Sequence, residues 1–268
     1  MKQFIKSFLR KNKFIEALAY ILQNNKFLNS SGDGEFDKDV DGMFQYAVST
    51  AKQYKDIYSG NLEYKIVLEI GTGFTRATML YMIKEYNLKK VYCYDRFNCL
   101  HENDKKIIEK FNLTKYLNKL EYISGTNDEI SKNIEANSID YIVSNAVLEH
   151  VDDMDLLFTN LNNVLADDGQ MYHKVDLRCH NRFKLHGELY FHTFSKKLWN
   201  MMGGNIGQPN RKLVCDYLEC FNKFNLICEV NKSEEFTSEE MNKAKIYLET
   251  NDMFKYIISV VEFRLCKK

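Results

Sequence analysis

Short apolar runs alternate with helix-length segments from about residue 65 onward. The apolar runs cover residues 65–70, 90–95, 120–124, 139–144 and 170–175, and the helical segments cover residues 75–86, 104–118, 128–135 and 152–165. The triplets Ile66-Val67-Leu68 and Tyr141-Ile142-Val143 are apolar at every position, as expected for strands that are covered on both faces. This alternation predicts an α/β fold with a doubly wound, mostly parallel sheet and right-handed crossovers.

The C-terminal part follows a different order of elements. A helix at residues 211–224 leads to a strand at 225–230, and a helix at 238–249 leads to a last strand at 256–265. Two strands that follow the parallel series in this way predict a closing hairpin at one edge of the sheet, which brings the expected total to seven strands.

The N-terminal part predicts a helical extension over residues 1–60, ahead of a main domain over residues 61–268. Residues 2–28 are basic, with apolar positions near helical spacing, and a second helical stretch ends near Ile57. The basic helix has two interpretations. It either contacts a membrane surface or an acidic partner, or lies across the main domain with its charges in water.

Composition narrows the possible partners and the compartment. Lys plus Arg and Asp plus Glu number 37 each, so the net charge gives no bulk attraction to nucleic acid. The seven cysteines form no Cys-x-x-Cys pair and are expected to be reduced thiols. No transmembrane segment or secretion signal is evident, so we expect a cytoplasmic protein.

The first predicted strand runs into a glycine turn, in the stretch KIVLEIGTGFTRATML. Gly71 and Gly73 let the backbone approach a ligand closely, and Thr72 with the following helix N-terminus offers free N–H groups. Asp95 closes the second strand, where a carboxylate can bind both hydroxyls of a ribose. Phe74 and Thr75 stand where a dinucleotide fingerprint needs a third glycine. The pattern therefore indicates a ligand that contains a nucleoside and argues against NAD.

These motifs resemble those of the class I S-adenosylmethionine-dependent methyltransferases. VLEIGTG resembles the first motif of that family, Asp95 matches its ribose-binding acid, and SNAVLEHV at residues 144–151 resembles its fourth motif. The resemblance implies a Rossmann-like fold and S-adenosylmethionine as the cofactor.

The same resemblance implies roles for single residues. Glu69 would orient the glycine loop or meet the methionine ammonium, and Gly71, Thr72 and Gly73 would pass beneath the methionine and the ribose. Arg96 or Phe97 would cover the adenine, and Asn127 stands where the family has its adenine-binding acid. Asn145 and Ala146 would lie beside the methionine part through their backbone.

A cluster of histidines supplies candidates for the chemistry. Five of the six histidines fall between residues 150 and 192, and the run HKVDLRCH brings His173, Asp176 and His180 toward the end of the fifth strand. His173 or His180 could take the proton of the acceptor, with Asp176 fixing the tautomer. His186 and His192 are interpreted as surface or packing residues. Glu149, His150 and His180 could instead hold a divalent metal, although no spacing rule supports this alternative.

The segment at about residues 177–210 is too long for a bare connector and is expected to shape the acceptor pocket. HKVDLRCH, FHTFSKKLWNMMG and GQPNR resemble a bacterial group of methyltransferases associated with cell-surface sugar assembly, such as capsule biosynthesis. That resemblance implies O-methylation of a sugar or a nucleotide-activated sugar, whose phosphates Arg178, Arg182 or Arg211 could hold. The alternatives are an N-methyltransferase acting on an amino sugar or amino alcohol, and a methyltransferase-like module that only binds partners.

Overall fold

A seven-stranded mixed sheet organises the chain. The computed structural model describes residues 13–24, 39–179, 183, 186–203, 208–248 and 252–268. The strands are β1 Ile66–Ile70, β2 Lys90–Asp95, β3 Leu120–Ser124, β4 Ile139–Asn145, β5 Leu165–Asp176, β6 Leu226–Glu235 and β7 Ile258–Lys267, in the order β3-β2-β1-β4-β5-β7-β6. The first five are parallel, whereas β7 is antiparallel to both β5 and β6. The predicted doubly wound sheet and its closing hairpin are confirmed.

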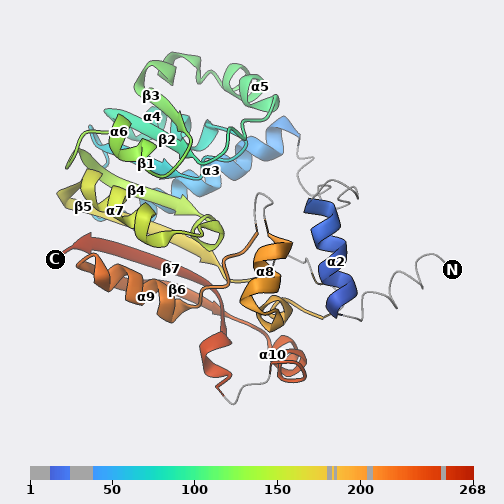
Figure 1. The fold of residues 1–268 in the computed structure, drawn as a ribbon. Coiled ribbons are helices and arrows are strands. Elements are labelled where there is room, and N and C mark those ends of the chain that lie inside the picture. The colour runs from blue at the N-terminus through green and yellow to red at the C-terminus, as the bar shows by residue number, and fades with distance from the viewer. Residues whose placement is uncertain (1–12, 25–38, 180–182, 184–185, 204–207, 249–251) are drawn as a thin grey trace.

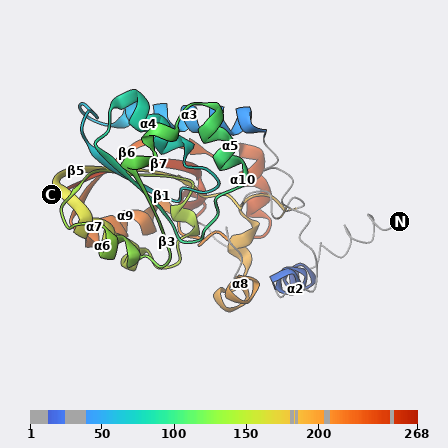
Figure 2. The same ribbon diagram turned by 90° about the horizontal axis from the view of Figure 1, so that it is seen from above.

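Helices cover both faces of this sheet, as the uniformly apolar strands require. The helices α3 Val40–Ile57, α4 Ala77–Tyr86 and α5 Asn103–Lys110 lie on one side, and α6 Glu129–Asn133, α7 Met154–Val164 and α9 Val214–Lys223 lie on the other (Figure 2). Two separate hydrophobic cores result, one built around Val67 and Tyr141, the other around Leu68 and Ile142. The β1 and β4 side chains alternate between these cores because successive residues of a strand point to opposite faces.

Some element boundaries differ from the prediction. The helix expected over residues 104–118 ends at Lys110, and a 3-10 turn follows at Thr114–Lys119. Asn112 separates the two with a φ of 56°, a left-handed conformation that cannot continue an α-helix. The sixth strand continues to Glu235, beyond the predicted end at residue 230, because it pairs with β7 as far as Ile258, the first residue of that strand. The helix α10 spans Ser238–Lys245.

The N-terminal helix packs on the segment that follows the fifth strand. Of the predicted helix over residues 2–28, the described part is α2 Lys13–Asn24, and residues 2–12 and 25–28 lie outside the described residues. Ala17 of α2 is buried in an aromatic cluster with Phe183, Phe191 and Trp199, the last from α8 Lys196–Met202. Part of the apolar face of α2 is therefore used inside the protein. Within the described part of the chain, no helix has the length and apolar character needed to cross a bilayer.

The aromatic cluster lies beyond the carboxyl edge of the sheet. Figure 1 shows α2 and α8 side by side, on the side toward which the arrows of β4 and β5 point. Ligands of open α/β sheets bind at this carboxyl edge. The arrangement places the segment after β5 where an acceptor pocket was expected.

Candidate functional site

The loop after β1 has the backbone that its glycines predict. Gly71 and Gly73 have φ values of 75° and 67°, in the region that other residues rarely adopt. A Cβ on Gly71 would collide with the side chain of Val147, whereas a Cβ on Gly73 would meet nothing within 4 Å. Gly71 is therefore needed for packing, and Gly73 faces open space that a ligand can fill.

Asp95, at the end of β2, holds this loop in place. Its carboxylate accepts hydrogen bonds from the N–H of Gly73 at 2.8 Å and of Phe97 at 3.0 Å. Burial raises the pKa of Asp95, and the two backbone hydrogen bonds oppose that rise. A carboxylate has about four acceptor sites, so two remain for the hydroxyls of a bound ribose.

Glu69 lies beneath the loop, 5% exposed. Burial raises its pKa to about 8, while the nearby Thr72 hydroxyl and the Cys93 thiol partly offset this effect. The hydroxyl of Thr72 is buried and has no hydrogen bond of good geometry. Glu69 therefore carries a proton at neutral pH in the free protein, and a cation placed next to it would favour its charged form.

Asp104 supports the loop from behind, a role that the sequence did not suggest. Its carboxylate accepts hydrogen bonds from the backbone N–H of Arg76 at 2.8 Å and from the hydroxyl of Thr75 at 3.1 Å. It also accepts two hydrogen bonds from the Arg76 guanidinium, at 3.0 and 2.5 Å. This buried ion pair stands at the start of α4 and fixes the direction in which the chain leaves the glycine loop.

The end of β4 lies opposite the loop. Ala146 has a φ of 55°, a strained backbone for a residue with a Cβ, and its N–H donates to the carbonyl oxygen of Lys174. The side chain of Asn145 donates to the hydroxyl of Tyr46 at 2.9 Å. Tyr46 belongs to α3, so this helix reaches the end of β4, a contact that no sequence pattern indicated.

The residues expected near an adenine lie at the rim. Arg96 and Phe97 are exposed, and Arg96 forms a 3.7 Å ion pair with Asp152, which follows the turn after β4. Asn127 accepts a hydrogen bond from the hydroxyl of Tyr94 at 3.0 Å. These side chains surround the carboxyl ends of β2 and β3, where the resemblance places the adenine.

His173 lies inside the protein, in the core between the sheet and α7. It is 0% exposed, its Nδ1 is 2.8 Å from the hydroxyl of Ser144, and its ring packs edge-on against Phe158 of α7. Burial lowers its pKa to about 3, so the ring is neutral. Met171 and Val175 point to the same face of β5 and are also buried, which shows that strand alternation places His173 in the core.

Asp176 does not contact His173 through any described hydrogen bond. Its carboxylate instead accepts three hydrogen bonds from Arg178, from the backbone N–H and two guanidinium nitrogens, at 3.1, 2.8 and 2.6 Å. His180, the third catalytic candidate, lies outside the described residues, as does Arg182.

Asn210 ties the segment after α8 to the turn after β4. Its N–H donates to the carbonyl oxygen of Glu149 at 2.6 Å, and its side chain donates to those of Leu148 at 2.8 Å and Val151 at 2.9 Å. These contacts join the end of the expected acceptor segment to the turn after β4, whose Val147 lies next to Gly71. The sequence motif GQPNR contains Asn210 but does not reveal this role.

Glu149 is buried beneath this junction, 2% exposed. One carboxyl oxygen accepts from the N–H of Asp176 at 3.2 Å, and the other has no partner among the described residues. Burial raises the pKa of Glu149 to about 8. The described residues contain no group of three or more metal-ligating side chains, and the proposed metal set of Glu149, His150 and His180 includes one residue outside that part of the chain.

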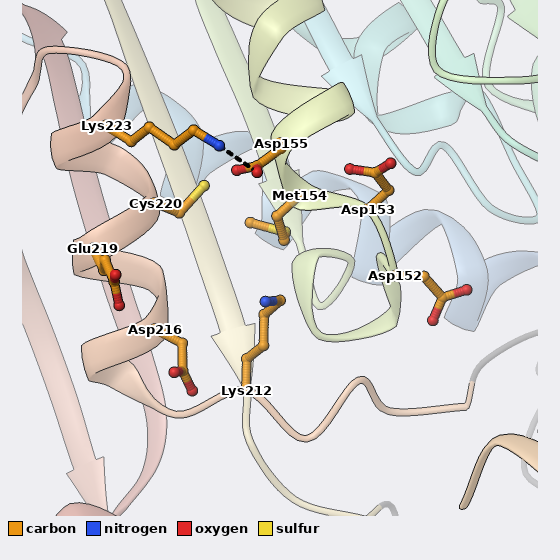
Figure 3. Close-up of a pocket in the computed structure, with 9 residues that line it drawn as sticks. All are labelled: Asp152, Asp153, Met154, Asp155, Lys212, Asp216, Glu219, Cys220 and Lys223. Atoms are coloured by element: carbon orange, nitrogen blue, oxygen red, sulfur yellow. Dashed lines mark hydrogen bonds and ion pairs between the residues drawn. The ribbon is translucent and has the colours of Figure 1, made fainter. Parts of the chain in front are cut away.

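A separate pocket of about 510 Å³ lies between α7 and α9 (Figure 3). Three of its five acidic residues have structural tasks: Asp153 caps α7, Asp216 accepts from the N–H of Leu213 at the start of α9, and Asp155 pairs with Lys223. None of the site residues expected from the sequence lines this pocket. We therefore regard it as a surface groove.

Comparison with known proteins agrees with this geometry. Residues 38–211, more than half of the chain, match the family described as "Methyltransferase domain". A search of curated protein sequences gives no match.

Two solved structures show the same fold at low sequence identity. Phosphoethanolamine N-methyltransferase 2 of Haemonchus contortus, solved with S-adenosyl-L-methionine, superposes with a TM-score of 0.53 at 16% identity, covering 82% of this chain and 52% of that one. This chain thus spans about half the length of that enzyme. Geranyl diphosphate C-methyltransferase of Streptomyces coelicolor A3(2) gives a TM-score of 0.55 at 10% identity, covering 90% and 86%. The chain belongs to the methyltransferase domain family and has the class I methyltransferase fold.

Proposed function

We propose that S-adenosylmethionine lies against the glycine loop, between the ends of β1, β2 and β4. The open space at Gly73 supports this placement, because a Cβ there would meet no protein atom within 4 Å, so a ligand can approach the backbone. Asp95 would bind the ribose with its remaining acceptor sites, and Glu69 would meet the methionine ammonium. The other residues proposed to line the cofactor are Gly71, Thr72, Arg96, Asn127, Asn145 and Ala146.

When bound, S-adenosylmethionine supplies a methyl group on a positively charged sulfur, which is already an activated leaving group. The chain therefore has two tasks, to align the acceptor atom with that methyl group and to manage the acceptor's proton. The acceptor decides which side chains are needed, since a hydroxyl requires a base and an amine requires only deprotonation and placement.

For the acceptor, we propose a hydroxyl group of a sugar or a nucleotide-activated sugar. The Asn210 contacts support the place of this acceptor, because they tie the end of the segment after β5 to the turn after β4. The resemblance of HKVDLRCH and GQPNR to methyltransferases of surface-sugar assembly gives this segment its substrate class.

The proton of that hydroxyl needs a base. His173 is neutral, fully buried and bonded to Ser144, which disfavours it as the base, and the carboxylate of Asp176 is engaged by Arg178. His180 is the remaining candidate of the histidine run, and we propose it as the proton acceptor. His173 would then act as a positioning residue for Ser144 beneath the site.

An amine acceptor is the second candidate. The burial of His173 favours it, since a neutral amine needs no strong base in the protein. A neighbour in fold is named for N-methylation of phosphoethanolamine.

Methylated product, measured by mass spectrometry over a panel of nucleotide sugars, amino sugars and amino alcohols, separates the two. We expect a nucleotide sugar to be methylated, turnover to be lost in His180→Ala, and turnover to persist in a folded His173→Phe variant. Methylation of amines alone, with His180→Ala as active as the parent, would replace the hydroxyl by an amine. A His173→Phe variant that folds and binds the cofactor yet has no turnover would restore His173 as the base.

A further inference from the structure

Two cations near the carboxyl edge have no acidic partner in the described part of the chain. Arg211 and Lys255 form no ion pair with any acidic residue that the structure describes. One guanidinium nitrogen of Arg211, Nη1, donates to the carbonyl oxygens of Phe191 and Phe194, at 3.5 and 2.5 Å. Its Nε and Nη2 donate to no acceptor among the described residues, so half of the donor fork is left for a ligand.

The aromatic cluster holds Arg211 in position. The guanidinium carbon lies 5.3 Å from the centre of the Trp199 ring. The indole N–H of Trp199 in turn donates to the carbonyl oxygen of Pro209 at 3.1 Å, and Gln208 donates to the carbonyl oxygen of Trp199. The arginine therefore sits on a fixed support and loses little freedom when it binds an anion.

His192 completes the cluster. Its Nε2 is buried and has no hydrogen-bond partner in the described part of the chain. The His192 ring packs edge-on against the ring of Tyr256, with the ring centres 5.0 Å apart. The Lys255 ammonium lies 5.2 Å from the centre of the Tyr256 ring. Burial, followed by the positive charges of Arg211 and Lys255, lowers the pKa of His192 to about 3. A buried ring nitrogen without a partner is costly, and a ligand atom would satisfy it.

The cluster also stands at the place expected for the acceptor. Arg211 directly follows Asn210, which is bonded to the turn after β4. Tyr256 lies just before β7, whose first residues adjoin the end of β5 through the N–H of Leu177 and the carbonyl oxygen of Ser259, 2.8 Å apart. Residues distant in sequence thus converge on one side of the carboxyl edge.

We propose that Arg211, Lys255 and His192 bind a phosphate group of the acceptor substrate, an assignment that rests on the proposed function for the place of the acceptor. The free side of the Arg211 fork suits two phosphate oxygens, and Lys255 adds a mobile point charge. Neutral His192 can donate from Nε2 to a third oxygen. A nucleotide sugar and a phosphorylated amino alcohol share this group, so the site selects for the phosphate and leaves the methylated atom to the rest of the pocket.

Inorganic pyrophosphate is the probe, titrated into the full chain by calorimetry. Lys255→Gln removes an exposed charge and is expected to fold normally, and Arg211→Lys keeps the charge but loses the fork. Lys243→Gln is the matched control, because Lys243 is an exposed lysine of α10 whose partner is Glu239. We expect pyrophosphate affinity to fall about tenfold in Lys255→Gln and in Arg211→Lys, and to be unchanged in Lys243→Gln. S-adenosylmethionine affinity should be the same in all four proteins.

The imidazole proton resonances of His192 give a second readout. Bound phosphate should raise the pKa of His192, because a nearby negative charge favours the protonated ring. Absence of pyrophosphate binding to the parent, or binding that neither variant weakens, would overturn the proposal. Product formation from nucleotide sugars that is insensitive to both variants would leave the proposed function standing and remove the anion site. Anion binding that depends on Arg211 and Lys255, with no product from any sugar, would support the anion site and overturn the proposed sugar acceptor.

Discussion

The carboxylate of Asp95 accepts a 2.8 Å hydrogen bond from the backbone N–H of Gly73. An acid at the end of the second strand thus holds the turn that follows the first, and both lie at the carboxyl edge of the sheet. Because the same carboxylate keeps acceptor sites free, it can hold the loop and a ribose at once. The two sequence signals that indicated a nucleoside are joined by this one contact.

Replacing Asp95 by Ala is expected to weaken S-adenosylmethionine binding by about ten- to a hundredfold, because hydrogen bonds to a charged group contribute about 1.5–3 kcal/mol. Asp95→Asn should lose less, since the amide oxygen still accepts. Calorimetry measures both. Asp167→Ala, which alters a carboxylate that is 94% exposed, is the control and should bind like the parent. Equal affinity in Asp95→Ala and the control would remove Asp95 from the cofactor site.

Cofactor binding should release a proton from Glu69. The carboxyl pKa is raised to about 8 by burial, so Glu69 is protonated at neutral pH, and the methionine ammonium would favour its charged form. Affinity should therefore rise as the pH increases from about 6 to about 8. The heat of binding at pH 7 should differ between buffers of different ionisation enthalpy, and this difference should vanish in Glu69→Gln. Buffer-independent heats in the parent would contradict the contact.

The ion pair between Asp104 and Arg76 should contribute to the free energy of unfolding. Asp104→Ala leaves the half-buried Arg76 without its partner and should lower the free energy of unfolding by about 3–5 kcal/mol. Asp41→Ala breaks an exposed pair with Lys110 and should cost about 0–1 kcal/mol. Urea denaturation followed by circular dichroism compares the two. Similar losses in both variants would show that Asp104 does not anchor α4.

Asn210 should matter for the acceptor and not for the cofactor. Asn210→Ala removes two side-chain hydrogen bonds to the turn after β4, so the segment after α8 would be held less firmly. We expect the KM for the acceptor to rise about tenfold while S-adenosylmethionine affinity stays within about twofold of the parent. Steady-state kinetics with the acceptor found by the product screen provide the test. An unchanged KM would show that the Asn210 hydrogen bonds do not position the acceptor.

The sheet was predictable because its signals are local. The strand at residues 90–95 has the boundaries that its apolar run predicted, and the hairpin at the sheet edge follows from the order of the last strands. The break after Lys110 was not predictable in the same way, since the apolar spacing continues through Asn112 and only the backbone reverses there. Tertiary packing decides such a boundary.

For the site, the turn at Gly71 and Gly73 and the place of Asp95 beside it were predictable, whereas the burial of His173 was not anticipated. His173 stands near the end of a strand, and its alternation with Met171 and Val175 is the signal that could have indicated its burial. The supporting contacts of Asp104 with Arg76 and of Asn210 with the turn after β4 join residues far apart in the sequence. No local pattern could have revealed them.

The central claim, that the cofactor lies against the backbone of the glycine loop, is tested by titrating S-adenosylmethionine into the parent protein and into Gly73→Ala. A Cβ at Gly73 meets no protein atom within 4 Å, so its cost to the fold is limited to the strain of a positive φ, about 1–2 kcal/mol. Gly71→Ala, which collides with Val147, is the contrasting variant and should unfold far more readily. We predict that the parent binds and that folded Gly73→Ala binds at least about tenfold more weakly, because the added methyl group occupies the ligand's space. Undiminished binding by folded Gly73→Ala, or no binding by the parent, would contradict the claim.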